Sequence, residues 1–120
     1  MEQREEVWKA VSEWPCYSVS NLGRVRRTIP SPKSRGCRVL KDHLSTWGYH
    51  EVRLFGDRPP RWIRVHQLVV AAFVGEVPKG MEINHINGVK TDNRPQNLEI
   101  VTQKENHEHA VSLGLIKHQG

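Results

Sequence analysis

The stretch from Asn84 to Asn106, NHINGVKTDNRPQNLEIVTQKEN, combines one histidine, His85, with five asparagines. Because histidine titrates near neutrality, a neutral imidazole can take a proton from water at physiological pH. Asparagine does not titrate, but its carbonyl oxygen is a ligand for hard cations such as Mg²⁺. These residue types suggest phosphodiester hydrolysis, in which a divalent cation offsets charge on the phosphate and on the leaving oxygen.

Two short strands and a helix must position these residues. MEINHI predicts a strand that ends near His85 and is followed by an Asn-Gly tight turn. NLEIV predicts a second strand, which opens at Asn97. TQKE is a capping box with Thr102 as the N-cap, and it predicts a helix over residues 103–113 that stops at Gly114.

The helix of such a unit packs across its two strands, so that Asn106 can face the strand carrying His85. In a regular strand Asn84 points to the opposite side from His85, and it reaches the same site only where the strand end is bent. Asn97 has a different expected task, because a side-chain amide can bond backbone groups and fix the loop that aims the histidine.

Ordinary turn chemistry is the alternative interpretation of the same stretch. A lone histidine in a polar loop is more often a surface residue than a catalyst, and Asn-Gly and Asp-Asn are common turn pairs. Asn87 and Asn93 are accordingly interpreted as turn residues. The residue types alone leave both interpretations open.

The residues upstream predict short strands and one buried helix. Residues 2–11 predict a short helix or a frayed end, and CYSVSNLGRVRRT predicts a β-hairpin with arginines on its exposed face. GYHEVRLF and the start of RWIRV predict further strands. The apolar run with two alanines that follows predicts a helix over residues 66–74.

Positive charge is concentrated in one segment of this basic chain, which has a net charge of +5 and a pI near 9.6. Between residues 24 and 41 there is no Asp or Glu, and we expect few internal partners for the cations there, which phosphates would satisfy. A solvated basic loop is the alternative. The cations are Arg24, Arg26, Arg27, Lys33, Arg35, Arg38 and Lys41.

Composition argues against a membrane or secreted protein. No stretch approaches the roughly 20 apolar residues that span a bilayer, and the charged N-terminus lacks the apolar core of a signal peptide. The two cysteines, Cys16 and Cys37, are far apart and outside any C-x-x-C pair, which disfavours a disulfide framework or a zinc-binding module. We expect a cytoplasmic protein.

Several spaced motifs resemble the HNH endonucleases of phages and mobile introns. They are VHQLV at residues 65–69, NHINGVKTDN at 84–93, NLE at 97–99 and the ENHEHA segment at 105–110. Upstream, WPCYSVSNLGRVRR resembles the NUMOD4-like motif Y-x-V-S-N-x-G-x-V, and LKDHLSTWGYHEVRLF resembles the segment that joins the two. The resemblance implies an α+β fold, with a DNA-contacting N-terminal β-hairpin or sheet region and a ββα-metal (HNH) unit. We place these at residues 1–60 and 61–120, packed as one compact unit.

This resemblance implies a metal-dependent DNA endonuclease that hydrolyses phosphodiester bonds and nicks one strand per engagement. His85 stands at the first histidine of the motif and is implied as the general base, and Asn97 stands at the central asparagine that orients the loop and His85. Asn106 stands at the third position and is an implied metal ligand. Asn84 is the other implied ligand, at a position where many members have Asp. The implied cofactor is a divalent metal, Mg²⁺ or alternatively Mn²⁺.

Asn84 departs from the acidic pattern of the family. Because an amide is neutral, we expect it to hold a metal more weakly than Asp would, and the DNA phosphate would have to supply the anionic ligand. We therefore expect tight metal binding only when DNA is present. The same departure keeps an alternative open, in which the chain is a catalytically weak or inactive HNH-fold protein that only binds DNA.

Double-stranded DNA is the implied partner, bound by a monomer or a weak homodimer. Phosphate contacts position a protein on DNA, and arginines can also read guanine. The candidate DNA-binding residues are the seven cations of the basic segment together with Lys90 and His109. His66 precedes the buried helix and is interpreted as structural. Larger relatives continue into a helical DNA-binding region, so we expect weaker sequence specificity here, and the family suggests a phage or mobile-element origin.

Overall fold

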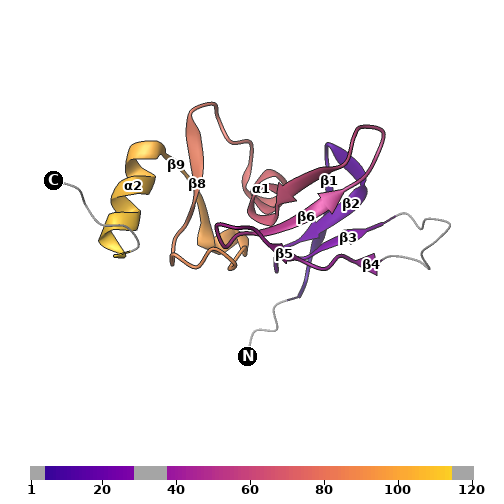
Figure 1. Ribbon diagram of the computed structural model, residues 1–120, viewed down its shortest axis with the longest axis horizontal. Coiled ribbons are helices and arrows are strands. Elements are labelled where there is room, and N and C mark those ends of the chain that lie inside the picture. The colour runs from indigo at the N-terminus through magenta and orange to yellow at the C-terminus, as the bar shows by residue number, and fades with distance from the viewer. Residues whose placement is uncertain (1–4, 29–37, 115–120) are drawn as a thin grey trace.

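The computed structural model describes residues 5–28 and 38–114, and its described part has the predicted α+β fold (Figure 1). The first antiparallel sheet consists, in spatial order, of β1 (Trp8–Val11), β2 (Trp14–Ser20), β3 (Val25–Arg27) and β4 (Arg38–Val39). The second consists of β5 (His43–Leu44), β6 (His50–Leu54) and β7 (Arg61–Arg64). The third pairs β8 (Met81–His85) with β9 (Leu98–Thr102). The helical elements are α1 (Val65–Val69), the π-helix η1 (Val70–Val74), the 3-10 helix η2 (Pro95–Asn97) and α2 (Gln103–Ser112).

The predicted N-terminal hairpin is confirmed as β2 and β3, in which Val19 pairs with Val25 and both side chains are fully buried. The prediction of a short helix or frayed end over residues 2–11 was wrong for Trp8–Val11, because these residues form β1 and pair antiparallel with β2. Residues 5–7 have no regular structure, and residues 2–4 lie outside the described residues. Pairing satisfies the backbone groups of β1 that face β2, and Val11 is buried in the core. The helix propensity of a short segment contributes less than its pairing with a neighbouring strand.

One hydrophobic core joins the N-terminal sheets to the later elements. Val65 and Val69 of α1 are fully buried, and they belong to the same cluster as Val19 of β2 and Leu98 of β9. A boundary after residue 60 would separate β6 from β7, although these strands pair along their length. Residues 1–60 and 61–120 therefore contribute to the same hydrophobic core.

The predicted helix over residues 66–74 is confirmed as a continuous helical segment, but its second half is not α-helical. An α-helix covers Val65–Val69, and the chain then widens into the π-helix Val70–Val74, whose end is marked by a bond from the Gly75 backbone N–H to the Val70 carbonyl at 2.8 Å. Gly75 has φ +148°, a conformation that side chains disfavour. The spacing of apolar residues in the sequence could not distinguish the α-helical part from the π-helical part.

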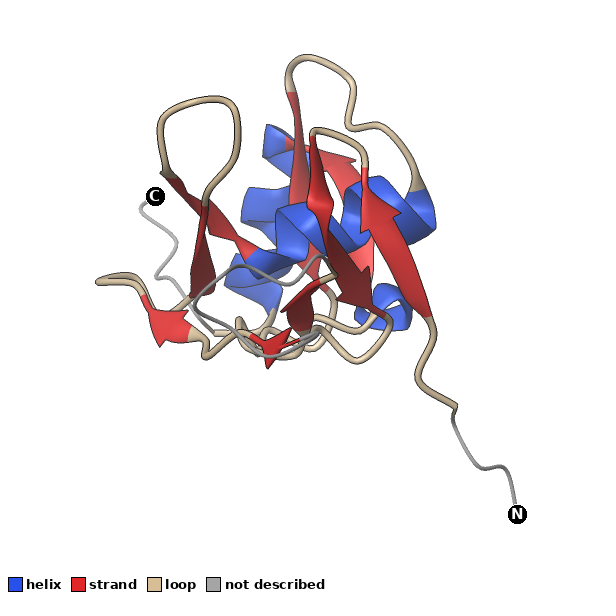
Figure 2. Ribbon diagram, turned by 90° about the vertical axis from the view of Figure 1, so that its right-hand side faces the viewer, coloured by secondary structure: helices blue, strands red, loops and turns tan. Residues whose placement is uncertain are grey.

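The C-terminal strands and helix form a ββα unit at one end of the molecule (Figure 1). Figure 2 looks at the molecule from the opposite end, with strands in red and helices in blue. The predicted capping box is confirmed, because Thr102 accepts from the Glu105 backbone N–H and Glu105 accepts from that of Thr102. Gly114, with φ +74°, follows the end of α2 as predicted. No helix in the described ranges is long and apolar enough to cross a lipid bilayer.

Candidate active site

His85 is the last residue of β8, and its side chain is 7% exposed. Its ring centroid lies 5.1 Å from that of His66 on α1, with the rings nearly perpendicular, and 6.0 Å from that of Tyr49, which precedes β6. The ring is therefore held by aromatic neighbours from outside the ββα unit. This environment is unlike the exposed polar turn of the alternative interpretation.

Asn93 fixes the orientation of the His85 ring. Its Oδ1 lies 2.8 Å from His85 Nε2 and can only accept, so Nε2 carries the hydrogen and Nδ1 holds the basic lone pair. Asn93 is 2% exposed and lies outside any turn, so its interpretation as a turn residue was wrong. The Asp-Asn pair suggested local turn chemistry, whereas the partner of Asn93 comes from the preceding strand.

Burial lowers the pKa of His85 below the ordinary value for histidine, because it disfavours the charged imidazolium. The cationic Lys90 lowers it further, whereas the Asn93 hydrogen bond and the charge of Asp92 act in the opposite direction. A lowered pKa keeps the imidazole neutral at neutral pH. Neutral imidazole is the form that can accept a proton.

The turn between β2 and β3 contacts the same asparagine. Gly23 has φ +81°, and a Cβ built there would lie 3.1 Å from the Cβ of Asn93, so the turn packs closely against it. A side chain at position 23 would meet both an unfavourable backbone conformation and this contact. The N-terminal hairpin thus supports the residue that orients His85.

Asn97 ties together the loop that follows β8. Its Oδ1 accepts from the Asn87 backbone N–H at 3.0 Å, and its Nδ2 donates to Asn87 Oδ1 and to the Asp92 carbonyl, both at 2.9 Å. Asn97 is 5% exposed, and Asn87 forms turn contacts as predicted, with its Oδ1 also accepting from Val89 N–H. These bonds hold the loop that leads from His85 to Asn93.

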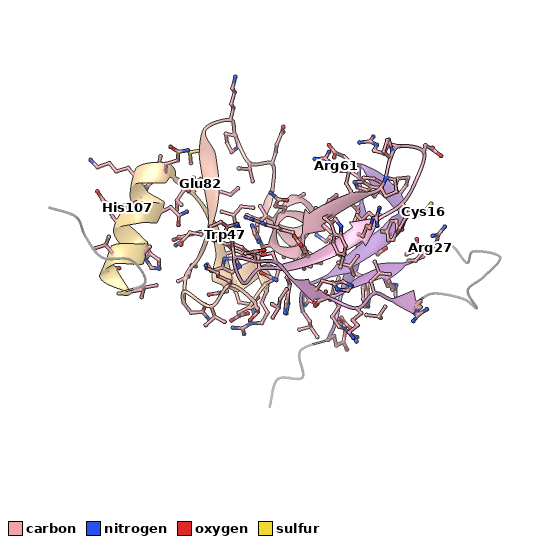
Figure 3. All side chains as sticks on the ribbon, in the orientation of Figure 1. Cys16, Arg27, Trp47, Arg61, Glu82 and His107 are labelled. Carbon is pink, nitrogen blue, oxygen red and sulfur yellow. The ribbon has the colours of Figure 1, made fainter. Side chains whose placement is uncertain are left out.

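Each of the other two asparagines donates its amide group to a carboxylate. Asn84 Nδ2 donates to Glu99 Oε1 at 2.8 Å, across the β8–β9 pair in which the two residues are direct neighbours. Asn106 Nδ2 on α2 donates to Glu82 Oε2 on β8 at 2.7 Å, and Figure 3 shows Glu82 on the side of the strand next to the helix. The placement of Asn106 against β8 agrees with the expected packing of the helix.

Sequence reasoning missed both carboxylates. Glu82 lies two residues before Asn84 and so shares its strand face, which strand periodicity could have indicated. Glu99 needed the β8–β9 register, which the sequence does not contain. Tyr49 was missed because it contacts His85 from outside the ββα unit, and Asn93 was missed because the Asp-Asn pair suggested a turn.

A cleft brings the predicted residues to one place. It is lined by Asn84 and His85 of β8, by Asn106 of α2, and by Tyr49 and Lys90 at its other side. Amide oxygens bordered by carboxylates suit a hard divalent cation, so the donor set fits such an ion. Within residues 5–28 and 38–114, no three His, Cys, Asp or Glu side chains converge as a metal site.

His66 is buried, with 6% of its surface exposed, and its Nδ1 lacks a hydrogen-bond partner among the described residues. Burial, with smaller effects from His85 and Arg64, lowers the pKa of His66 to about 3. His66 is therefore neutral in the folded protein at neutral pH. Its contacts with Tyr49 and His85 give it a structural position behind the proposed base.

Acid is expected to destabilise the protein through His66. In the unfolded chain this residue takes up a proton near pH 6.5, whereas the folded protein resists protonation until about pH 3, so stability falls as pH drops through that range. The loss between pH 7 and pH 5 should be about 2 kcal/mol. Urea denaturation at the two pH values measures it. His66→Gln should remove the part of this dependence that comes from His66, whereas His85, whose pKa is also lowered, keeps its own part. Exposed His107→Gln should not change the dependence, and equal pH dependence in His66→Gln and the wild type would contradict the assignment.

The basic hairpin has more internal partners than expected. Arg24 forms an ion pair with Glu6, and the guanidinium groups of Arg24 and Arg26 lie 5.6 Å and 4.2 Å from the ring centroid of Trp8. Arg27 lies 5.9 Å from the Tyr17 ring. The basic segment itself contains no Asp or Glu, so the sequence did not indicate that Glu6, from the N-terminal segment, would pair with Arg24.

The remaining DNA-binding candidates have varied surroundings. Arg38 and Lys41 are exposed, whereas Lys33 and Arg35 lie outside the described residues. Lys90 lies at the cleft, where its Nζ donates to the Trp47 carbonyl at 2.9 Å. His109 Nε2 lies 2.7 Å from the Ile86 carbonyl, to which it must donate, and this bond ties α2 to the turn after His85.

Two family profiles match the chain in separate regions. Residues 6–55 match the NUMOD4 motif and residues 64–108 match the HNH endonuclease family. The first match covers the N-terminal sheet and part of the second. The second runs from the end of β7 into α2 and includes His85, Asn97 and Asn106.

Similar proteins carry the same family name. The DNA endonuclease I-HmuI of Bacillus phage SP01 is 34% identical over 110 residues, which are 91% of this chain and 60% of that protein. The uncharacterised HNH endonuclease L247 of Acanthamoeba polyphaga mimivirus is 36% identical over 125 residues, covering 97% of this chain and 29% of its own length. A solved structure describing DNA binding and cleavage by the HNH homing endonuclease I-HmuI matches with a TM-score of 0.77 and 34% identity, covering 93% of this chain and 62% of that one. The chain thus spans less than two thirds of each of these relatives.

Proposed function

The chain belongs to the HNH endonuclease family, with a NUMOD4 motif before the HNH unit, and from this premise we propose that it cleaves double-stranded DNA. The reaction is hydrolysis of a phosphodiester bond, and one active site nicks one strand per engagement. The protein acts as a monomer or a weak homodimer inside the cell.

A single arrangement carries this proposal: a buried, oriented and neutral histidine borders the same cleft as two amide side chains that can ligate a metal. The Nε2–H bond to Asn93 leaves Nδ1 of His85 as the basic atom. A histidine held in this way suits general-base catalysis better than an ordinary surface residue would.

His85 is the general base of the proposed reaction. As the oxygen of a water molecule forms its bond to phosphorus, His85 Nδ1 takes the proton of that water and the bond between phosphorus and the leaving oxygen breaks. The Nε2–H···Asn93 bond persists and stabilises the imidazolium that results. Asn97 keeps the loop between His85 and Asn93 in place through its bonds to Asn87 and Asp92.

HNH endonucleases generally use a divalent metal ion, and here Asn84 and Asn106 would hold it through their Oδ1 atoms. Mg²⁺ is the ion that best matches oxygen ligands together with phosphate, and Mn²⁺ is the alternative. When bound, the metal would supply positive charge beside the phosphate and the leaving oxygen. The amides are neutral, so the site depends on other negative groups for charge.

The basic residues are the proposed DNA contacts. Arg26 and Arg27 are half-buried on β3, the neighbouring Arg24 is exposed, and Lys90 adds positive charge at the cleft. Phosphates can replace Glu6 as the partner of Arg24, since an exposed ion pair contributes little. Lys33, Arg35, Arg38, Lys41 and His109 complete the proposed set.

Incubation with supercoiled plasmid tests the function. The protein with Mg²⁺ or Mn²⁺ should convert supercoiled into open-circular DNA, and excess chelator should abolish the conversion. The nicked form should accumulate before linear DNA, since each engagement cuts one strand. Gel electrophoresis over a time course separates the three forms.

The same preparation should be assayed for DNA binding by fluorescence anisotropy. Binding without nicking in either metal would contradict the proposal and favour the non-catalytic DNA-binding alternative, for which the neutral Asn84 is the supporting feature. Nicking that persists in excess chelator would contradict the metal requirement.

A further inference from the structure

Each of the two candidate metal ligands forms a hydrogen bond with a glutamate, and the two pairs lie in different parts of the fold. Asn84 donates its Nδ2 group to Glu99 on the neighbouring strand, and Asn106 donates its Nδ2 group to Glu82 from the helix above the sheet. The distances are 2.8 Å and 2.7 Å. Both asparagines and Glu82 line the cleft that also contains His85.

A carboxylate partner decides which end of an amide faces the cleft. An ionised carboxylate accepts hydrogen bonds and cannot donate them, so it must bind the NH₂ group of the asparagine. The oxygen is then left available, and the described residues provide no donor for Oδ1 of either Asn84 or Asn106. Without the carboxylate, either amide could rotate and present its NH₂ group to a cation, which repels it.

The carboxylates also carry the charge that the amides lack. Neither Glu82 nor Glu99 forms an ion pair with a Lys, Arg or His in the described part of the chain. Their two negative charges are therefore not neutralised by a protein cation in direct contact. A divalent cation held by the neighbouring amide oxygens would place positive charge beside them.

We propose that Glu82 and Glu99 are positioning residues of the metal site, which orient the Oδ1 atoms of Asn106 and Asn84 toward a divalent cation and supply its negative charge. This deepens the proposed function, on which it rests. It replaces the expectation that neutral amides bind metal well only when DNA is present. The free protein binds Mn²⁺ or Mg²⁺, because Glu82 and Glu99 compensate for the missing aspartate.

Metal affinity of the free, full-length chain is the direct test. Mn²⁺ is titrated into the protein without DNA, with calorimetry for heat and electron paramagnetic resonance for the unbound ion. The variants are Glu82→Gln and Glu99→Gln, which keep the side-chain volume and a hydrogen-bond acceptor but remove the charge. Glu108→Gln on the exposed surface of α2 is the matched control, since it removes one charge outside the lining of the cleft.

Loss of a group that orients a metal ligand typically weakens binding by about 10–100-fold. We expect Glu82→Gln and Glu99→Gln each to weaken Mn²⁺ binding by at least about tenfold, and the double variant to weaken it more. Glu108→Gln should change the affinity by less than about threefold, as expected for a screened surface charge. Thermal denaturation without metal checks that the variants fold.

Two results would overturn the inference. One is an unchanged Mn²⁺ affinity in folded Glu82→Gln and Glu99→Gln relative to Glu108→Gln. The other is the absence of Mn²⁺ binding to the free wild-type protein at millimolar metal. Neither depends on DNA cleavage: carboxylate-dependent binding in a protein that fails to nick plasmid would support this inference and contradict the proposed function. Plasmid nicking by a protein whose metal binding does not depend on Glu82 or Glu99 would contradict this inference and support the proposed function.

Discussion

Replacing His85 with alanine is expected to lower the rate of plasmid nicking by about 10²- to 10⁴-fold, the usual contribution of a general base. The variant lacks the Nδ1 atom that accepts the proton, whereas the proposed metal ligands and the basic surface remain. DNA affinity should therefore stay within about threefold of the wild-type value, because His85 is absent from the phosphate-binding set. A plasmid time course and fluorescence anisotropy measure the two quantities.

Free imidazole provides the control for this experiment. His85→Ala removes a buried ring and leaves a space beside Asn93, Tyr49 and His66. If the base is the missing function, added imidazole should restore part of the nicking rate in a concentration-dependent manner. A folded His85→Ala variant that nicks within about threefold of the wild type would rule out the general-base assignment, since that loss is far below the expected range.

Asn97→Ala is expected to reduce the free energy of unfolding by about 2–4 kcal/mol, since it removes three partly buried hydrogen bonds and leaves the Asn87 N–H without its partner. The loop that leads from His85 to Asn93 would lose its anchor, so nicking should also fall in the folded fraction. Urea denaturation with linear extrapolation measures the stability change, and the plasmid assay at a temperature where the variant is folded measures the second effect.

Two further variants define what Asn97 does. Asn97→Asp keeps an acceptor for the Asn87 N–H but sets a carboxylate oxygen against the Asp92 carbonyl, so it should also be destabilised. Gln96→Ala is the matched control, because Gln96 is exposed in the same 3-10 turn, and it should change stability by no more than about 0.5 kcal/mol. A loss below about 1 kcal/mol in Asn97→Ala would show that its hydrogen bonds do not anchor the loop.

The predictions that agreed with the structure rest on local physics. The capping box at Thr102 involves residues three apart, and the helix that it begins ends before Gly114 as predicted. Strand periodicity located β8 and β9, and the tight turn after His85 follows from the Asn-Gly pair. In each case the residues that interact are close in sequence, so their pattern contains the information.

The predictions that were wrong involve competition between local preference and a distant partner. Residues 8–11 form β1 because β2 offers an edge for pairing, which outweighs the weak helix propensity of the segment. Asn93 was interpreted as a turn residue, and it is instead buried against His85 and Gly23. The cations of the basic segment were expected to have few internal partners, and Glu6 provides one for Arg24 from outside that segment.

The sequence by itself determined the resemblance to HNH endonucleases, the order of the motifs and the choice of His85, Asn97 and Asn106 as candidate site residues, because motif spacing and helix capping are properties of nearby residues. Only the tertiary structure decided what surrounds them. Burial lowers the pKa of His85, and the strand register and helix packing bring Glu99 and Glu82 to the two amides. These contacts join residues distant in the chain, and they exist only once the shared core has fixed how the sheets and helices pack.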